Sequence, residues 1–171
     1  MKATDEGKRL STGELAQLAL FCALMVAGKE GLRVIPNVHP VTLLIILCTC
    51  LYGRRALYPV AIFVAAEIAL YGFGLWNISY IWIWPLQVLT ALPFRSERSP
   101  LFWGCFAAIH GFAFGGICAL TTLAVAGPKV ALAFWVACIS FDLIHGVSNG
   151  ILTSVLYSPL MRLLARLTGR R

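Results

Sequence analysis

The sequence predicts an all-α integral membrane protein with six transmembrane helices. Only 12% of its 171 residues are charged and 60% are hydrophobic, whereas soluble domains average about 25% charged residues. The apolar residues gather in six segments, at 13–28, 40–52, 56–73, 78–93, 101–125 and 131–161. A spanning helix needs ~20 apolar residues, so the last two segments are long enough, the first and fourth are marginal, and 40–52 is short. We expect 35–39 to extend it, with irregular backbone near Pro36 and Pro40 lining a cavity.

Basic residues are distributed unevenly between the two ends of the predicted helices. If the N-terminus is cytoplasmic and the chain crosses six times, 11 of the 14 lysines and arginines lie on the inner side. Because inner loops are rich in these residues, both termini are predicted to be cytoplasmic. The chain is then a single transmembrane domain, 1–171, with a polar N-terminus (1–12) and a basic C-terminus (162–171). The basic residues form no continuous patch, so no nucleic acid partner is expected.

Four ionisable side chains lie inside the predicted helices, namely Glu67, His110, Asp142 and His145. A charge near the bilayer centre costs at least ~2.5–3.5 kcal/mol, so such residues usually face a partner, a cavity or a ligand. Each of them alone is also compatible with a buried hydrogen bond between helices. Together they favour a protein that handles a polar molecule within the membrane. His110 has no further signal around it and is assigned to packing.

The first apolar segment carries a row of small residues. Ala19, Ala23 and Ala27 recur at intervals of four, with Ala16 on an adjacent position. Residues four apart share a helix face, and a smooth face of this kind lets another helix approach closely. The spacing alone leaves open whether that helix belongs to this chain or to a partner.

Residues 67–84 combine a carboxylate with a dense set of aromatic side chains. Glu67 lies about six residues from the outer end of its helix, ~9 Å below it at 1.5 Å per residue, and Tyr71 follows one turn later on the same face. Gly72 and Gly74 then interrupt the helix, and further aromatic residues follow at Trp76, Tyr80, Trp82 and Trp84. Interfacial aromatic belts explain part of this pattern. A carboxylate below the aromatic residues favours a small-molecule pocket.

The last apolar segment contains Asp142, His145 and Asn149 at i, i+3 and i+7, on one helix face. Asp142 is predicted ~16 Å from the outer end of this helix, near the bilayer midplane. Asp142 and His145 can satisfy each other, so the pair either forms the floor of a pocket or fastens this helix. The run from Gly146 to Gly150 fits G-x-S-x-G, but the hydrolase motif requires a strand, a sharp turn and a helix. A helical setting therefore argues against a catalytic Ser148.

Motifs for metal binding and for ATP hydrolysis are missing from the sequence. The six cysteines lie in apolar segments without C-x-x-C spacing, which predicts free buried thiols, no metal site and no cofactor. No G-x-x-x-x-G-K-[ST] sequence is present, so the chain is not expected to hydrolyse ATP through a P-loop. A transporter of this size must therefore act passively, oligomerise or draw energy from partner subunits.

Several parts of the sequence together match a known pattern, namely the alanine row 19–27, residues 35–46, 52–54 and 67–76, and 141–145 with Asn149. Through them the chain resembles, over nearly its full length, the substrate-binding S components of energy-coupling factor (ECF) transporters. Within the family it is most similar to the cobalamin (vitamin B12) subgroup, through Asn37-x-x-Pro40 and the run 71–76. His39 and Asn77 depart from the subgroup pattern, which favours an acidic residue and a second aromatic residue at these positions.

The resemblance implies a high-affinity vitamin-binding subunit with six helices in the bacterial cell membrane. Its partners would be a membrane-embedded T component and two cytosolic ATPases, and the loops joining helices 1–2, 3–4 and 5–6 would close over the ligand. It implies that Ala19, Ala23 and Ala27 dock on the T component. Carried over, the family pocket includes Asn37, Glu67, Tyr71, Trp76 and Trp84, with His39 in the same loop. We add Asp142 and His145 as a hypothesis from their depth and helix face.

Two other classes of function are compatible with the residues. An intramembrane enzyme would use Glu67, Asp142 and His145, with His110, as acid-base or metal groups converging on a common point. An ion or proton carrier would need a continuous polar path across the membrane. Within the transporter hypothesis, the alternative to a corrinoid is another vitamin or micronutrient.

Overall fold

The computed structural model describes residues 9–35 and 38–169, which form helices and no strand. The six α-helices are α1 (Thr12–Gly31), α2 (Val41–Tyr52), α3 (Leu57–Tyr71), α4 (Leu75–Ala91), α5 (Pro100–Ala126) and α6 (Pro128–Thr168). Short 3-10 helices, η1 (Gly53–Ala56) and η2 (Leu92–Phe94), follow α2 and α4. Each predicted apolar segment is therefore a helix, and the all-helical class is confirmed. The segment at 131–161 was predicted too short, because α6 continues to Thr168.

Three helical stretches are long and apolar enough to cross a membrane, namely Val41–Tyr71, Pro100–Ala126 and Pro128–Thr168. The first combines α2, η1 and α3, which follow one another without a loop, although α2 itself ends at Gly53, whose φ is +59° and ψ −133°. These stretches support the transmembrane character of the protein. Six crossings and cytoplasmic termini remain predictions.

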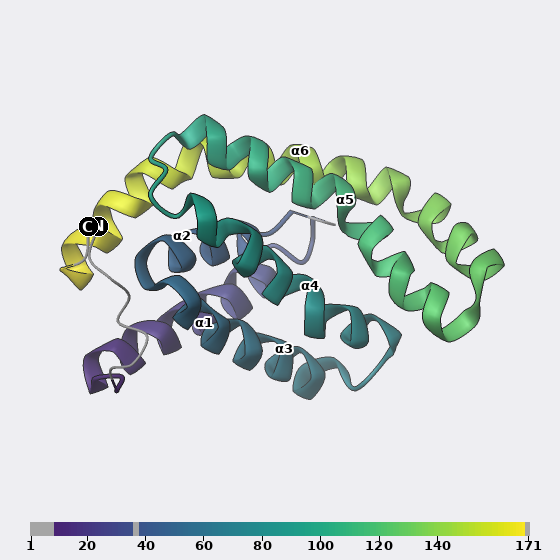
Figure 1. Cartoon of the computed structure of the whole chain (residues 1–171), viewed down its shortest axis with the longest axis horizontal. Coiled ribbons are helices and arrows are strands. Elements are labelled where there is room, and N and C mark those ends of the chain that lie inside the picture. Colours follow the sequence, from purple (N-terminus) through teal and green to yellow (C-terminus); the bar gives the residue numbers. More distant parts are fainter. Residues whose placement is uncertain (1–8, 36–37, 170–171) are drawn as a thin grey trace.

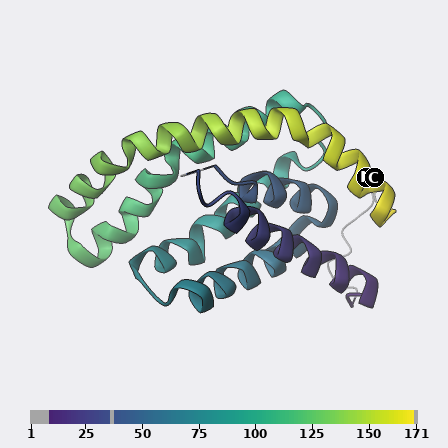
Figure 2. The ribbon, with the colours of Figure 1, turned by 180° about the vertical axis from the view of Figure 1, so that it is seen from behind.

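The chain is arranged as a long helical hairpin lying across a group of four helices. Figure 1 shows α5 and α6 side by side above α1–α4, with the turn between them projecting beyond the α3–α4 turn, and the rear view in Figure 2 shows the same arrangement. Sharp reversals at both turns use glycine at positive φ, +77° at Gly72 and +83° at Gly127, a conformation that costs other residues free energy. The ends of α3, α4, α5 and α6 are thereby brought to the same side of the molecule.

The α5–α6 hairpin is held by contacts between small residues. A Cβ atom added to Gly111 would lie 2.6 Å from Cα of Gly146, so the two backbones touch there. Gly104 faces Gly150 and Ser154 in the same interface. The run that fits G-x-S-x-G is thus a G-x-x-x-G packing surface in the middle of α6, typical of close helix association in membranes. The helical setting expected for Ser148 is confirmed.

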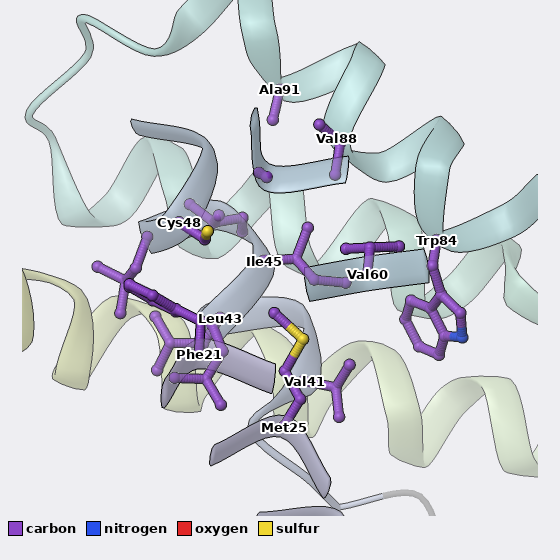
Figure 3. Packing of buried hydrophobic residues seen from close by; sticks show 14 of the residues in the cluster. Phe21, Met25, Val41, Leu43, Ile45, Cys48, Val60, Trp84, Val88 and Ala91 are labelled. Atoms are coloured by element: carbon purple, nitrogen blue, oxygen red, sulfur yellow. The ribbon is translucent and has the colours of Figure 1, made fainter. Parts of the chain in front are cut away.

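The hydrophobic core surrounds α2, whose residues Val41–Thr49 are all buried. Figure 3 shows Phe21 and Met25 of α1, Val60 of α3, and Trp84 and Val88 of α4 around it. A helix of 12 residues is ~18 Å long, and it is apolar on every side because it is enclosed on every side. Because α2 is enclosed, the candidate site lies outside this core, at the ends of α1, α3 and α4.

Candidate functional site

A cavity of about 420 Å³ lies where the ends of α1, α3 and α4 meet the segment that joins α1 to α2. Its lining combines charged side chains from the end of α1 and the segment after it with aromatic side chains of α3 and α4. The described lining residues are Lys29, Glu30, Leu32, Arg33, Ile35, Val38, His39, Tyr71, Trp76 and Tyr80. A concave site with aromatic walls and a few polar groups is the usual form of a small-molecule site.

Glu67 lies beneath this cavity and forms an ion pair with Lys29. The Glu67 side chain is fully buried, whereas that of Lys29 is 22% exposed and lines the cavity. Lys29 Nζ also lies 4.8 Å from the centroid of the Tyr71 ring, a distance at which a cation is attracted to the ring face. One carboxylate oxygen of Glu67, Oε1, has no hydrogen-bond partner among the described residues. Lys29 therefore links the buried carboxylate to the cavity.

Tyr71 connects α3 to the end of α1. Its hydroxyl donates a hydrogen bond to Glu30, and the guanidinium of Arg33 lies 5.5 Å from its ring centroid. Arg33 and Glu30 form a second, more exposed ion pair at 3.9 Å. Together these contacts hold the end of α1 against the last turn of α3 at the cavity wall.

A row of aromatic side chains runs from the cavity wall into the core. Ring centroids are 6.3 Å apart for Tyr71 and Trp76, 5.0 Å for Trp76 and Tyr80, and 5.4 Å for Tyr80 and Trp84. All three pairs meet edge to face, a favourable arrangement for aromatic rings. Trp76 lines the cavity, whereas Trp84 is buried deeper. The period of four on α4 places Trp76, Tyr80 and Trp84 on one face.

His39 joins the α1–α2 segment to this row. Its ring lies 6.3 Å from that of Trp84 and 5.0 Å from that of His145. Burial, with a contribution from the nearby Lys29 charge, lowers the pKa of His39 to about 4. The imidazole is therefore neutral at pH 7, and it meets both rings edge to face. Asn37, the other predicted site residue of this segment, lies outside the described residues.

Asp142 and His145 are directed to different neighbours. An oxygen of Asp142 accepts a hydrogen bond from the backbone N–H of Gly115 at 2.9 Å, which fastens α6 to α5. His145 instead packs on His39 and, at 5.0 Å, on Phe114. Asn149, on the same face, donates to Thr42 of α2 at 3.2 Å. His145 is thus connected to the cavity through His39, whereas Asp142 serves the α5–α6 interface.

His110 faces α4, away from the other ionisable residues. One ring nitrogen lies 3.0 Å from the hydroxyl of Thr90, and the ring packs against Phe106. The four ionisable side chains of the predicted helices therefore engage four different groups, Lys29, Thr90, Gly115 and His39. None of the contacts described above joins two of these four side chains.

The alanine row of α1 lies on the outer surface of the molecule. Ala19, Ala23 and Ala27 are all exposed, whereas Leu18, Phe21, Cys22 and Met25 on the other side of the helix are buried. The spacing of the alanines left open whether the row packs within this chain or against a partner. In the structure the row does not pack against another helix of this chain.

Seven residues of the cavity were not among the predicted site residues: the charged or aromatic Lys29, Glu30, Arg33 and Tyr80, and the apolar Leu32, Ile35 and Val38. The first three follow the apolar part of α1 and look like ordinary charged residues at a helix end. Nothing in the sequence marks Lys29 as the partner of Glu67, because that pairing depends on how α1 and α3 pack. Asn77, which departs from the family pattern, accepts a hydrogen bond from the Gly74 N–H at 2.5 Å and caps the start of α4.

The cysteines are free thiols; Cys22, Cys48 and Cys118 are buried as predicted, Cys50 and Cys138 are partly buried, and the prediction of burial is wrong for Cys105, which is exposed. Among residues 9–35 and 38–169, no group of three or more His, Cys, Asp and Glu side chains is placed to hold a metal ion. No protein-family model, curated protein or solved structure matches the chain. The geometry of the cavity and the character of the helices are therefore the basis for assigning a function.

Proposed function

We propose that this chain is the substrate-binding S component of an ECF-type importer in a bacterial cell membrane. It would cross the membrane six times with both termini in the cytoplasm, bind a vitamin from outside, and rely on a T component and two ATPases for energy. The observation that carries the proposal is the cavity formed by the ends of α1, α3 and α4 and the α1–α2 segment. Two of the three connections with which S components close over their ligands, those joining helices 1–2 and 3–4, adjoin this cavity, whereas the described lining includes no residue of the α5–α6 turn.

The side chains that line the cavity support a vitamin-like ligand. Trp76 and Tyr80 offer flat apolar surfaces, and Lys29, Glu30 and Arg33 offer donors and acceptors within reach of them. The volume of about 420 Å³ is in the range of ~300–1,000 Å³ found for small-molecule sites. A corrinoid, the ligand expected from the subgroup, is a large macrocycle and would require the cavity walls to move apart. A smaller vitamin would fit with less rearrangement.

Mass spectrometry of small molecules that co-purify with the protein tests the ligand. We expect a vitamin to be present in stoichiometric amount and to be lost from a Trp76→Ala variant, with Trp135→Ala, an exposed tryptophan on α6, as the matched control. Recovery of another vitamin instead of a corrinoid would remove cobalamin and retain the family. Finding that no vitamin binds the purified protein, in any titration, would contradict the proposal.

The exposed alanine row supports docking to a T component. A tryptophan at Ala23 would project from this smooth face and prevent close helix contact. We expect Ala23→Trp to abolish uptake driven by the energising subunits while ligand binding is kept, and Ala133→Trp, on an exposed position of α6, to preserve both. Normal uptake by the Ala23 variant would contradict the docking assignment.

A further inference from the structure

A second cavity, of about 430 Å³, lies at the opposite end of the molecule, between the η2–α5 connection and the last part of α6. Its described lining consists of Arg98, Tyr157, Ser158, Met161, Arg162 and Ala165. Ser158, Met161, Arg162 and Ala165 follow one another at i, i+3, i+4 and i+7, so they share one face of α6. Arg98 approaches this face from the connection that precedes α5.

The charge of this cavity is positive and uncompensated. Within residues 9–35 and 38–169, neither Arg98 nor Arg162 takes part in an ion pair, and both are exposed. Arg166 lines an adjoining surface cavity that shares Arg162. Glu97 does not line the cavity, and its carboxylate accepts hydrogen bonds from the N–H groups of Arg98 and Ser99 at 2.7 and 2.8 Å. These backbone bonds, that of Ser99 first, also lower the pKa of Glu97.

The position of the arginines corresponds to the edge of the apolar region. Arg98 lies two residues before the apolar stretch Pro100–Ala126. On α6, Ser154 is beside Gly104, and Arg162 follows eight residues later, ~12 Å further along the helix axis. Antiparallel packing of α5 and α6 therefore brings both arginines to one cavity, Arg98 just before the stretch Pro100–Ala126 and Arg162 in the last turns of the stretch Pro128–Thr168.

Next to the arginines, the surface is apolar. Leu163 and Leu167 are 51% and 69% exposed on the adjoining side of α6, and Met161 lies inside the cavity. Guanidinium groups bind phosphate oxygens through paired hydrogen bonds, and Ser158 supplies a hydroxyl at the same place. A phosphate beside hydrophobic chains is the chemistry of a phospholipid, and basic pockets between transmembrane helices are known to hold such headgroups.

We propose that Arg98, Arg162 and Ser158 form a binding site for the headgroup of an anionic phospholipid, with its acyl chains along Met161 and the exposed leucines of α6. The site is at the far end of the protein from the ligand cavity, and it does not depend on which ligand that cavity binds. An anionic lipid held there would tie the η2–α5 connection to the end of α6.

Native mass spectrometry of the detergent-solubilised full chain, titrated with dioleoyl-phosphatidylglycerol or dioleoyl-phosphatidylcholine, tests the site. We expect the anionic lipid to bind at least about tenfold more tightly than the zwitterionic one. Each basic group near a charged lipid surface corresponds to about a fivefold change in affinity. Arg98→Gln combined with Arg162→Gln should therefore weaken phosphatidylglycerol binding by about 25-fold if the two effects add.

Lys129→Gln, an exposed cation at the other end of α6, is the control and should change binding by less than about twofold. Circular dichroism would establish that each variant retains its helical fold. Equal binding of the two lipids, or equal loss in the control and in the arginine variants, would overturn the proposal. Displacement of phosphatidylglycerol by millimolar inorganic phosphate would also overturn it, because the site would then be one for a free anion.

Discussion

The ion pair between Lys29 and Glu67 predicts an unequal response to removal of its two partners. The side chain of Glu67 is fully buried, whereas that of Lys29 is 22% exposed at the cavity. Lys29→Met leaves a buried carboxylate without its cation. Glu67→Gln leaves a lysine that can turn toward the cavity, and the glutamine oxygen can still accept a hydrogen bond from it.

The magnitudes follow from this difference in burial. Removing one member of a buried ion pair costs about 3–5 kcal/mol when the remaining charge stays buried, so Lys29→Met is expected in that range. For Glu67→Gln the loss is expected near 1 kcal/mol, the usual net contribution of one hydrogen bond. The double variant buries a polar amide without a partner, which costs about 1–3 kcal/mol. We therefore expect the double variant to be more stable than Lys29→Met alone.

Reversible unfolding in mixed detergent micelles, followed by circular dichroism at pH 7, measures these differences. The expected order of stability is wild type, Glu67→Gln, the double variant and then Lys29→Met. Finding Glu67→Gln to be as destabilising as Lys29→Met would refute the reasoning from burial. Additive losses in the double variant would show that the two side chains are not coupled.

Two further predictions concern helix packing and pH. Gly111→Ala should destabilise the protein by about 1–3 kcal/mol in the same unfolding assay, because its Cβ would meet backbone atoms of α6. Gly31→Ala, which has open space around it, should not destabilise the protein. Equal effects of the two substitutions would argue against a tight α5–α6 contact. In the folded protein the pKa of His39 is lowered to about 4, whereas histidine in an unfolded chain has a pKa near 6.5. As the pH falls from about 6.5 to 4, the unfolded chain therefore binds a proton that the folded protein does not, and the free energy of unfolding decreases. The stability of His39→Gln should fall less over this window, and parallel curves would contradict that prediction.

The helices could be predicted from the sequence because each is marked by local composition. The predicted segments match the observed helices, and the breaks at Gly72 and Gly74 coincide with the turn between α3 and α4. The end of α6 was underestimated because its last turns are basic and amphipathic, so the apolar run stops before the helix does. Local patterns carry no comparable information on whether a helix crosses a bilayer fully.

Partners of the ionisable residues were harder to predict, because they depend on how helices meet. The spacing of Asp142 and His145 allows them to pair, yet Asp142 reaches a backbone N–H of α5. It can do so because Gly115 has no side chain, and a Cβ there would lie 2.5 Å from the carboxylate. In the same way, a lysine at the end of α1 gives no sign in the sequence that it will pair with Glu67. Such pairings follow from tertiary packing and not from periodicity.

The contacts around the cavity at the ends of α1, α3 and α4 also indicate how it would widen around a large ligand. Its α1 and α3 walls are joined by the Lys29–Glu67 ion pair and the Glu30–Tyr71 hydrogen bond, whereas the segment leading into α2 contacts the deeper aromatic row through His39. Ring contacts contribute about 0.5–1.5 kcal/mol each beyond their burial, less than the rupture of a buried ion pair would cost. A ligand too large for about 420 Å³ would therefore displace His39 from Trp84 and His145 before it separates α1 from α3.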